Sequence, residues 1–172
     1  LSDCMISNVI INIKASSIQG NKHIGGFCGI SKNTMIKDSK ISGELIILGV
    51  NYIEVQNEKQ IITVPQEIGG FIGSSFNSQF TNCQLNIVGS ITGYNYISGF
   101  SSVDLNSKFN NCSMELDGKI NAFSSFGLFC SFTKDVNTRL SVFYQCKIGV
   151  KTRLNNILVN IQNINSYSLI AN

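Results

Sequence analysis

Six cysteines and one histidine are the residues of this chain that could carry thiol or metal chemistry. Four of the cysteines stand in one short pattern, in which apolar residues flank a polar residue and the cysteine. The copies are LSDCMI (1–6), FTNCQL (80–85), FNNCSM (109–114) and FYQCKI (143–148), and IKDSKI (36–41) has serine in place of cysteine. Zinc sites draw on closely spaced Cys and His ligands, often as CxxC pairs. The chain has no CxxC, and His23 stands alone before two glycines, so the spacing disfavours zinc.

Carboxylates are the other groups that could do chemistry, because β-helical enzymes that cleave polysaccharides need several of them on one face. Only ten acidic residues occur, and Glu54, Glu58 and Glu67 fall in one segment while the others are scattered. A single histidine and the lack of a phosphate-binding loop give no sign of a nucleophilic triad or a phosphoryl-transfer site. We therefore expect no enzyme, no catalytic residue and no cofactor. The alternative is a carbohydrate-active enzyme whose site residues follow no pattern recognised in the sequence.

An internal repeat is the strongest signal in the sequence. IGGFCGISKNTMIKDSKISGELIILG (24–49), IGGFIGSSFNSQFTNCQLNIVGSITG (68–93) and ISGFSSVDLNSKFNNCSMELDGKINA (97–122) align without gaps. A fourth copy starts at Phe126, and the copies that start at residues 68, 97 and 126 are 29 residues apart. Partial copies stand at both ends of the chain, from Leu1 and up to Asn172.

Within each copy the apolar residues alternate with polar ones, as strands with one buried face require. Recurrent glycines, such as Gly49 and Gly93, suit tight corners with positive φ. Short strands, sharp corners and a constant period predict an all-β fold, a β-solenoid of about 29-residue coils over residues 1–172. The whole chain would then be one solenoid segment, a fragment of a longer protein.

Equivalent residues of successive coils lie about 4.8 Å apart in such a stack. The pattern around the cysteines therefore predicts one internal structural ladder, formed by Cys4, Ser39, Cys83, Cys112 and Cys146. In-register parallel neighbours point the same way and form disulfides poorly. Cys28 and Cys130 occupy one slot in coils three apart, too far to be bridged at roughly 14 Å. We expect buried free thiols, with a disulfide framework as the alternative.

The IGGFIG…FTNC…G frame resembles the GLUG motif, a glycine-rich tandem repeat of secreted and surface proteins. The resemblance covers nearly the whole chain. It implies a right-handed parallel β-helix in a stalk or passenger domain, and the family has no shared catalytic residues to transfer. The coils here are longer than the family's, and Leu128 replaces the second glycine in the fourth copy.

Residues 50–67 interrupt the repeat, and YIEV and IITV there flank the polar turn NEKQ, which predicts a β-hairpin projecting from the stack. Insertions in a solenoid lie on its surface and often carry binding. Tyr52, Glu54, Glu58 and Lys59 are the candidate partner-binding residues. A loop without a function is the alternative.

Three weaker signals have simple structural alternatives. Asp3 and Asp38 precede ladder positions, so two carboxylates could meet in a cation site, although corner stacks usually bond backbone. Asn111-Cys112-Ser113 is a glycosylation sequon that we expect to be buried and unmodified. Residues 134–153 hold Lys134, Arg139, Lys147, Lys151 and Arg153 against Asp135, a pattern most typical of a solvated face.

Composition narrows the function classes. A net charge of +3 gives no basic face for nucleic acid, and no apolar run is long enough to span a membrane. We expect a non-enzymatic structural or adhesive solenoid of a larger extracellular or cell-surface protein. Its partners would be further coils of the same chain or neighbouring subunits at both open ends, with carbohydrate as a second partner class. An intracellular structural component is the third reading, which reduced thiols would suit.

Overall fold

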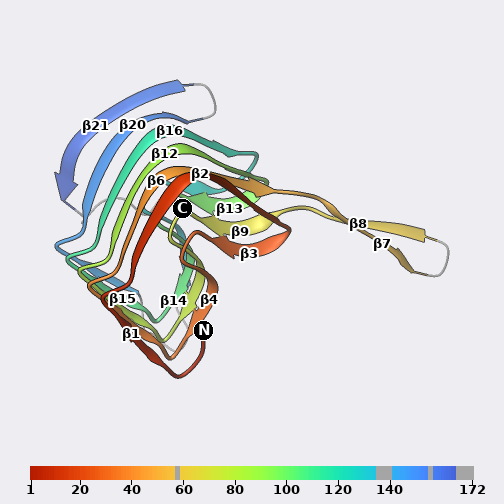
Figure 1. Ribbon diagram of the computed structural model, residues 1–172. Helices are drawn as coiled ribbons and strands as arrows, with labels where there is room; N and C mark the ends of the chain where they lie inside the picture. The colour runs from red at the N-terminus through yellow and green to blue at the C-terminus, as the bar shows by residue number, and fades with distance from the viewer. Residues whose placement is uncertain (57–58, 135–140, 155–156, 166–172) are drawn as a thin grey trace.

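The computed structural model describes residues 1–56, 59–134, 141–154 and 157–165, and the side chains of residues 1–55, 60–131 and 141–149. The described residues form strands and the turns between them, with no helix among them. All the strands but β7, β8 and β21 lie in parallel pairs, so the prediction of an all-β fold is confirmed, and the parallel sheets are consistent with a β-helix. Figure 1 shows the strands of successive repeats stacked side by side.

Each repeat contributes one strand to each of four sheets. The long sheet contains β2 (Ile10–Gly20), β6 (Lys40–Gly49), β12 (Gln84–Gly93), β16 (Ser113–Ala122), β20 (Lys147–Leu154) and the antiparallel edge strand β21 (Ile157–Asn165). The corner sheet contains β1 (Met5–Ser7), β5 (Met35–Lys37), β11 (Gln79–Thr81), β15 (Lys108–Asn110) and β19 (Val142–Tyr144).

The other two sheets pack against each other. The inner sheet contains β4 (Cys28–Lys32), β10 (Ile72–Phe76), β14 (Ser101–Leu105) and β18 (Cys130–Lys134). The short sheet contains β3 (Lys22–Gly25), β9 (Gln66–Gly69), β13 (Asn95–Ser98) and β17 (Phe126–Gly127). The register pairs residues 29 positions apart, such as Gln84 with Ser113 and Ile68 with Ile97, which is the spacing of the sequence copies.

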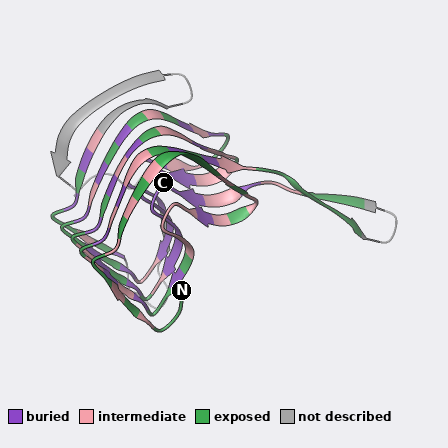
Figure 2. Ribbon diagram, in the orientation of Figure 1, coloured by how far each residue is buried: buried purple, intermediate pink, exposed green. Residues whose placement is uncertain are grey.

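Burial follows from this layering (Figure 2). In the long sheet Leu85 and Ile87 point inward and are buried, whereas Val88 is exposed, which is the alternation that the sequence shows. The first four residues of β10 and of β14 are all buried, because the short sheet covers the face that the core does not. Ser74 of β10 contacts His23 of β3 across this junction, at 3.0 Å from Oγ to Nδ1.

Phenylalanine rings form two columns through the core. Phe80, Phe109 and Phe143 stack with centroid separations of 4.6 and 4.9 Å, as the sequence alignment predicts. The second column contains Phe27, Phe71, Phe100 and Phe129, at 4.6 to 4.8 Å. Phe100 also meets Phe109 edge-on at 6.2 Å, so the columns support each other. Stacked and edge-on pairs of this kind each add about 0.5–1.5 kcal/mol beyond area burial.

The corner strands β1, β5, β11 and β15 are bounded on both sides by polar residues in the left-handed region, and β19 is followed by one. The first corner has Asp3, Asn33, Asn77 and Asn106, with φ between 48° and 53°, and the second has Asn8, Asp38, Asn82, Asn111 and Gln145, with φ between 49° and 58°. Asn and Asp adopt this conformation more readily than other non-glycine residues. Their side chains also bond from repeat to repeat, for example Asn106 Nδ2 to Asn77 Oδ1 at 2.7 Å.

The expectation that the recurrent glycines have positive φ is wrong, although Gly70 and Gly99 do lie in the bend between the short and inner sheets. Gly49 and Gly93 do not have positive φ, and the glycines that do, Gly43, Gly89 and Gly118, lie within the long sheet. The recurrent glycine of the short sheet is needed for close approach instead: a Cβ on Gly69 would stand 2.0 Å from the carbonyl oxygen of Ile72.

Candidate functional site

The buried ladder of the second corner contains Ser39, Cys83, Cys112 and Cys146, each of them buried. The thiols donate to carbonyl oxygens of their own and the preceding repeat: Cys83 to Thr81 and Ile36, at 3.5 and 3.4 Å. Cys112 does the same to Asn110 and Phe80, at 3.5 Å each. Free cysteines occupy all six positions in the structure, so these side chains fasten one repeat to the next as weak hydrogen-bond donors.

Cys4 is not a member of this ladder, contrary to the expectation from sequence. Met5 pairs with Met35 and Ile11 with Ile41, which places Cys4 at the first corner, where its sulfur lies 3.8 Å from the Thr34 hydroxyl. Val9 takes the ladder position beside Ser39. The first corner has its own ladder of small buried hydroxyls, formed by Thr34, Ser78, Ser107 and Ser141.

The same register separates Asp3 from Asp38. Asp3 accepts from Asn33 Nδ2 at 2.9 Å at the first corner, while Asp38 accepts from Asn82 Nδ2 at 2.7 Å at the second. The two carboxylates therefore do not form the predicted cation site. Bonds from the Ser2 hydroxyl and from Asn33 hold the pKa of Asp3 below its usual value.

Asn111 is exposed, so the expectation that its sequon lies in the buried ladder is wrong for the asparagine itself. Its Nδ2 donates to Asn82 Oδ1 at 2.8 Å, and its φ is 50°. Only the following Cys112 is buried.

A buried carboxylate lies in the inner sheet, where no pattern in the sequence predicts one. Asp104 is fully buried, and its carboxylate accepts from Ser75 and Ser101 at 2.5 Å each and from the Cys130 thiol at 2.9 Å. Burial raises the pKa of Asp104 to about 6, although these three bonds oppose the rise. Its counterparts are Ser31 and Ser75 in the two preceding repeats and Thr133 in the following one, so a carboxylate stands here where the other repeats have a hydroxyl residue.

The predicted hairpin is present, as β7 (Tyr52–Gln56) paired antiparallel with β8 (Lys59–Thr63). It projects away from the stacked sheets in Figure 1. Tyr52 and Glu54 are exposed; Glu58 lies outside the described residues, as does the side chain of Lys59. The apolar side chains of the hairpin are also exposed, including Ile53 (56%), Val55 (66%), Ile61 (43%) and Ile62 (58%). This apolar surface has no partner among the described residues.

The root of the hairpin is fixed to the short sheet by polar groups. Asn21 Nδ2 donates to the carbonyl oxygens of Val50 and Thr63, at 3.0 and 2.8 Å. Just beyond the root, the Glu67 carboxylate lies 2.5 Å from His23 Nδ1 and accepts from the Ser74 hydroxyl at 2.7 Å.

Ser74, His23 and Glu67 contain the residue types of a hydrolytic triad, which the sequence does not bring together. Their geometry argues against that chemistry. Ser74 is fully buried, and its hydroxyl already donates to Glu67 on the same side of the imidazole. Burial lowers the pKa of His23 in spite of the neighbouring carboxylate. The cluster joins β3, β9 and β10 and thus stabilises the strands next to the root of the hairpin.

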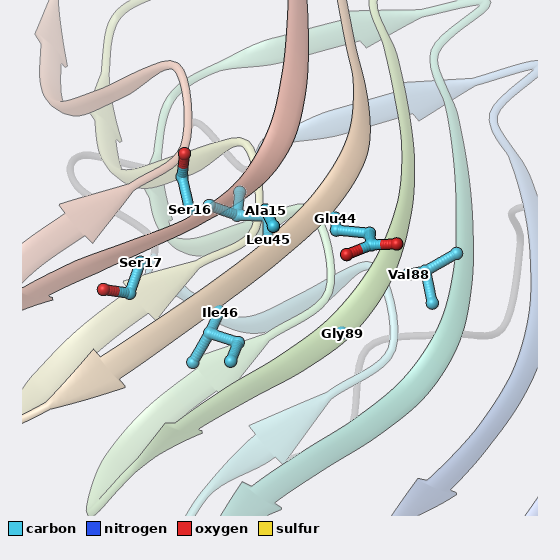
Figure 3. Close-up of a pocket in the computed structure, with 8 residues that line it drawn as sticks. All are labelled: Ala15, Ser16, Ser17, Glu44, Leu45, Ile46, Val88 and Gly89. Atoms are coloured by element: carbon cyan, nitrogen blue, oxygen red, sulfur yellow. The ribbon is translucent and has the colours of Figure 1, made fainter.

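Two further surface features lie on or beside the long sheet. Tyr94 and Phe123 stack at 4.5 Å after the ends of β12 and β16, and the Phe123 side chain is 75% exposed. An open groove of about 420 Å³ lies across β2, β6 and β12. Figure 3 shows the residues that line it, which are 15–17, 44–46, Val88 and Gly89. A register shift between Lys14 and Ser16 and the positive φ of Gly89 accompany this hollow.

Most of the basic side chains expected between residues 134 and 153 lie outside the described part of the structure. Arg139 lies outside the described residues, as do the side chains of Lys134, Lys151 and Arg153, and Lys147 is exposed. Among the described side chains, no three His, Cys, Asp or Glu residues lie close enough together to hold a metal ion. The described part of the chain contains no helix that could cross a membrane.

No known family model matches the chain, and searches of curated proteins and of solved structures also find no match. The resemblance to GLUG repeats therefore stays a prediction.

Removing the hairpin should leave the sheets intact. With residues 51–65 deleted, Val50 alone would join Gly49 to Gln66, as Tyr94 alone joins Gly93 to Asn95 in the next repeat. Among the described strands, those of the hairpin pair only with each other. We therefore expect an unchanged β-sheet circular dichroism spectrum and a loss of no more than about 1 kcal/mol in the free energy of unfolding. Loss of the β-sheet signal would instead make residues 51–65 part of the core.

Proposed function

We propose that this chain is a β-solenoid, a right-handed parallel β-helix of about 29-residue coils, with a structural rather than catalytic function. The observation that supports it best is the continuity of the side-chain columns. Two phenylalanine columns, two corner ladders of Asn and Asp, and two ladders of buried hydroxyls or thiols join neighbouring repeats. Each repeat is bonded to its neighbours by its side chains as well as by its backbone.

Continuous side-chain columns are typical of a rigid element that holds other parts of a protein or assembly at a fixed distance. Stacked repeats bury their core only against one another, and their strands add about 4.8 Å of length per coil. The chain would serve as a stalk or assembly element of a larger protein, with further coils or neighbouring subunits covering the edges of β1 and β2. We also propose a location outside the cell or at its surface, which the resemblance to GLUG repeats supports.

The proposal can be tested by removing one coil. Deletion of residues 94–122 joins Gly93 to Phe123, which occupies the position of Tyr94 one coil later. In a solenoid the shortened chain still folds with one cooperative melt, because Phe71 can stack on Phe129 as it did on Phe100. Small-angle scattering should show a smaller particle volume, because the stack is then one strand spacing, about 4.8 Å, shorter. A chain that fails to fold after this seamless deletion would contradict a modular solenoid.

Carbohydrate binding is a second candidate, favoured by the exposed Phe123 ring, because one aromatic face can stack on a sugar. Asn121 lies close by and donates from Nδ2 to the Thr92 hydroxyl at 3.3 Å. Titration of the chain with soluble oligosaccharides tests this candidate, with Phe123→Ala as the variant that should lose binding and Val88→Ala as the control on the same sheet.

A further inference from the structure

We propose that the hairpin β7–β8 is a self-association arm, in which β8 pairs antiparallel with β8 of a second copy of this chain. The inference goes beyond the structural function proposed above, because a solenoid needs no arm. A two-stranded ribbon is at best marginally stable in water without further strands or a covering layer. The described part of the chain offers the arm neither of these.

The exposed side chains give the arm an apolar face, which a sheet of three or more strands needs for stability. The register places Ile53 opposite Ile62 and Val55 opposite Gln60, so three aliphatic side chains share one face. All three are more than half exposed. Monomeric proteins seldom leave contiguous apolar surface of this kind uncovered, and such patches mark interaction sites.

The two free edges of the arm differ in charge. Glu54 stands at the middle of β7, so the antiparallel pairing of β7 with its own copy that uses the whole strand places two carboxylates opposite each other. Like charges directly opposite destabilise a strand pair. The middle residue of β8 is Ile61, and the same symmetric pairing places Ile61 opposite Ile61. The edge of β8 thus accepts a second copy where the edge of β7 repels one.

The backbone of β8 also fits a twofold axis at Ile61. In an antiparallel ladder the N–H and C=O groups of every second residue point away from the existing partner strand. A register centred on Ile61 pairs Gln60 with Ile62 of the copy, so even-numbered residues lie opposite even-numbered ones. The backbone N–H and C=O groups that point away from β7 in one copy therefore face the corresponding groups of the other copy. The result is a four-stranded antiparallel sheet that places Ile53, Val55 and Ile62 of both copies on one face.

Sedimentation of the whole chain at micromolar concentration tests the arm. Ile61→Lys puts two ammonium groups opposite each other at the twofold axis, and we expect the dimer dissociation constant to rise at least about tenfold. Tyr52→Lys is the matched control: it makes the same change on the same face of the arm, but on the strand away from the axis, and should leave the dimer intact. Circular dichroism shows whether both variants are folded.

A distance measurement separates this dimer from end-to-end stacking of solenoids. Opposite residues of an antiparallel pair have Cα atoms about 4.5–5.5 Å apart, within the range of a disulfide. Under mild oxidation Ile61→Cys should therefore form a covalent dimer, at least about tenfold more than Tyr52→Cys or the unsubstituted chain. Equal cross-linking of the two variants, or a dimer unaffected by Ile61→Lys, would overturn the proposal and would leave the solenoid untouched.

Discussion

Cys83→Asp should abolish the folded state of the central repeats, whereas Cys83→Ser should fold. The Cys83 side chain is fully buried, and its thiol donates to the carbonyl oxygens of Ile36 and Thr81, which would repel a carboxylate. Burying an unpaired charge costs several kcal/mol, comparable to the whole stability of an ordinary domain. The aspartate variant would have to stay protonated or unfold.

Serine is the matched control because Ser39 already occupies the equivalent position one repeat earlier. Its hydroxyl donates to the Lys37 carbonyl at 2.8 Å, as the thiol of Cys83 does to Thr81. We expect the melting temperature of Cys83→Ser to fall by only a few degrees, about 1 kcal/mol. An unchanged melting temperature for Cys83→Asp would show that the position faces solvent.

The period of the fold and its second corner could be predicted from sequence because they depend on local chemistry. Small residues follow Asp or Asn at Ser39, Cys83 and Cys112, and the preceding phenylalanine or isoleucine of each copy marks the strand that packs beside them. The hairpin was predictable for the same reason, since its two β-branched runs flank a polar turn.

The register of the first copy could not be predicted from the cysteine pattern alone. Both corners use a short polar residue in the left-handed region followed by a small buried one, so LSDC fits either. A second signal was present: Asn33-Thr34, Asn77-Ser78 and Asn106-Ser107 each precede the second corner by five residues. Asp3-Cys4 precedes Asn8-Val9 by the same five, and this spacing assigns Cys4 to the first corner.

The burial of Asp104 was hidden for a different reason. Alternation in sequence distinguishes the two faces of a strand only when one of them meets water. The strand β14 lies between the core and the short sheet, where the Ser102 hydroxyl donates to the Tyr96 carbonyl, so both faces are dry. No local pattern reports which strands of a coil are covered twice.

Replacing Asp104 should make the protein more stable at neutral pH. Its pKa of about 6 in the folded state exceeds the 3.8 of an unburied carboxyl by about 2 units, which corresponds to about 3 kcal/mol. Because the folded pKa is raised, the folded state favours the protonated form. The stabilisation from this group is fully present below pH 4 and is lost as the pH rises through 6. At pH 7 the ionised carboxylate therefore weakens the fold.

Asp104→Ser gives the cleanest comparison, since Ser31 and Ser75 stand at this position in the two repeats before it. The free energy of unfolding is measured by urea denaturation at pH 4 and at pH 7. From the lower to the higher pH, the unsubstituted chain should lose about 2 kcal/mol relative to the variant. The difference isolates Asp104, because every other titrating group is common to both proteins. Equal pH dependence of the two proteins would mean that the carboxylate keeps its charge at no cost, through water reaching it between β10 and β14.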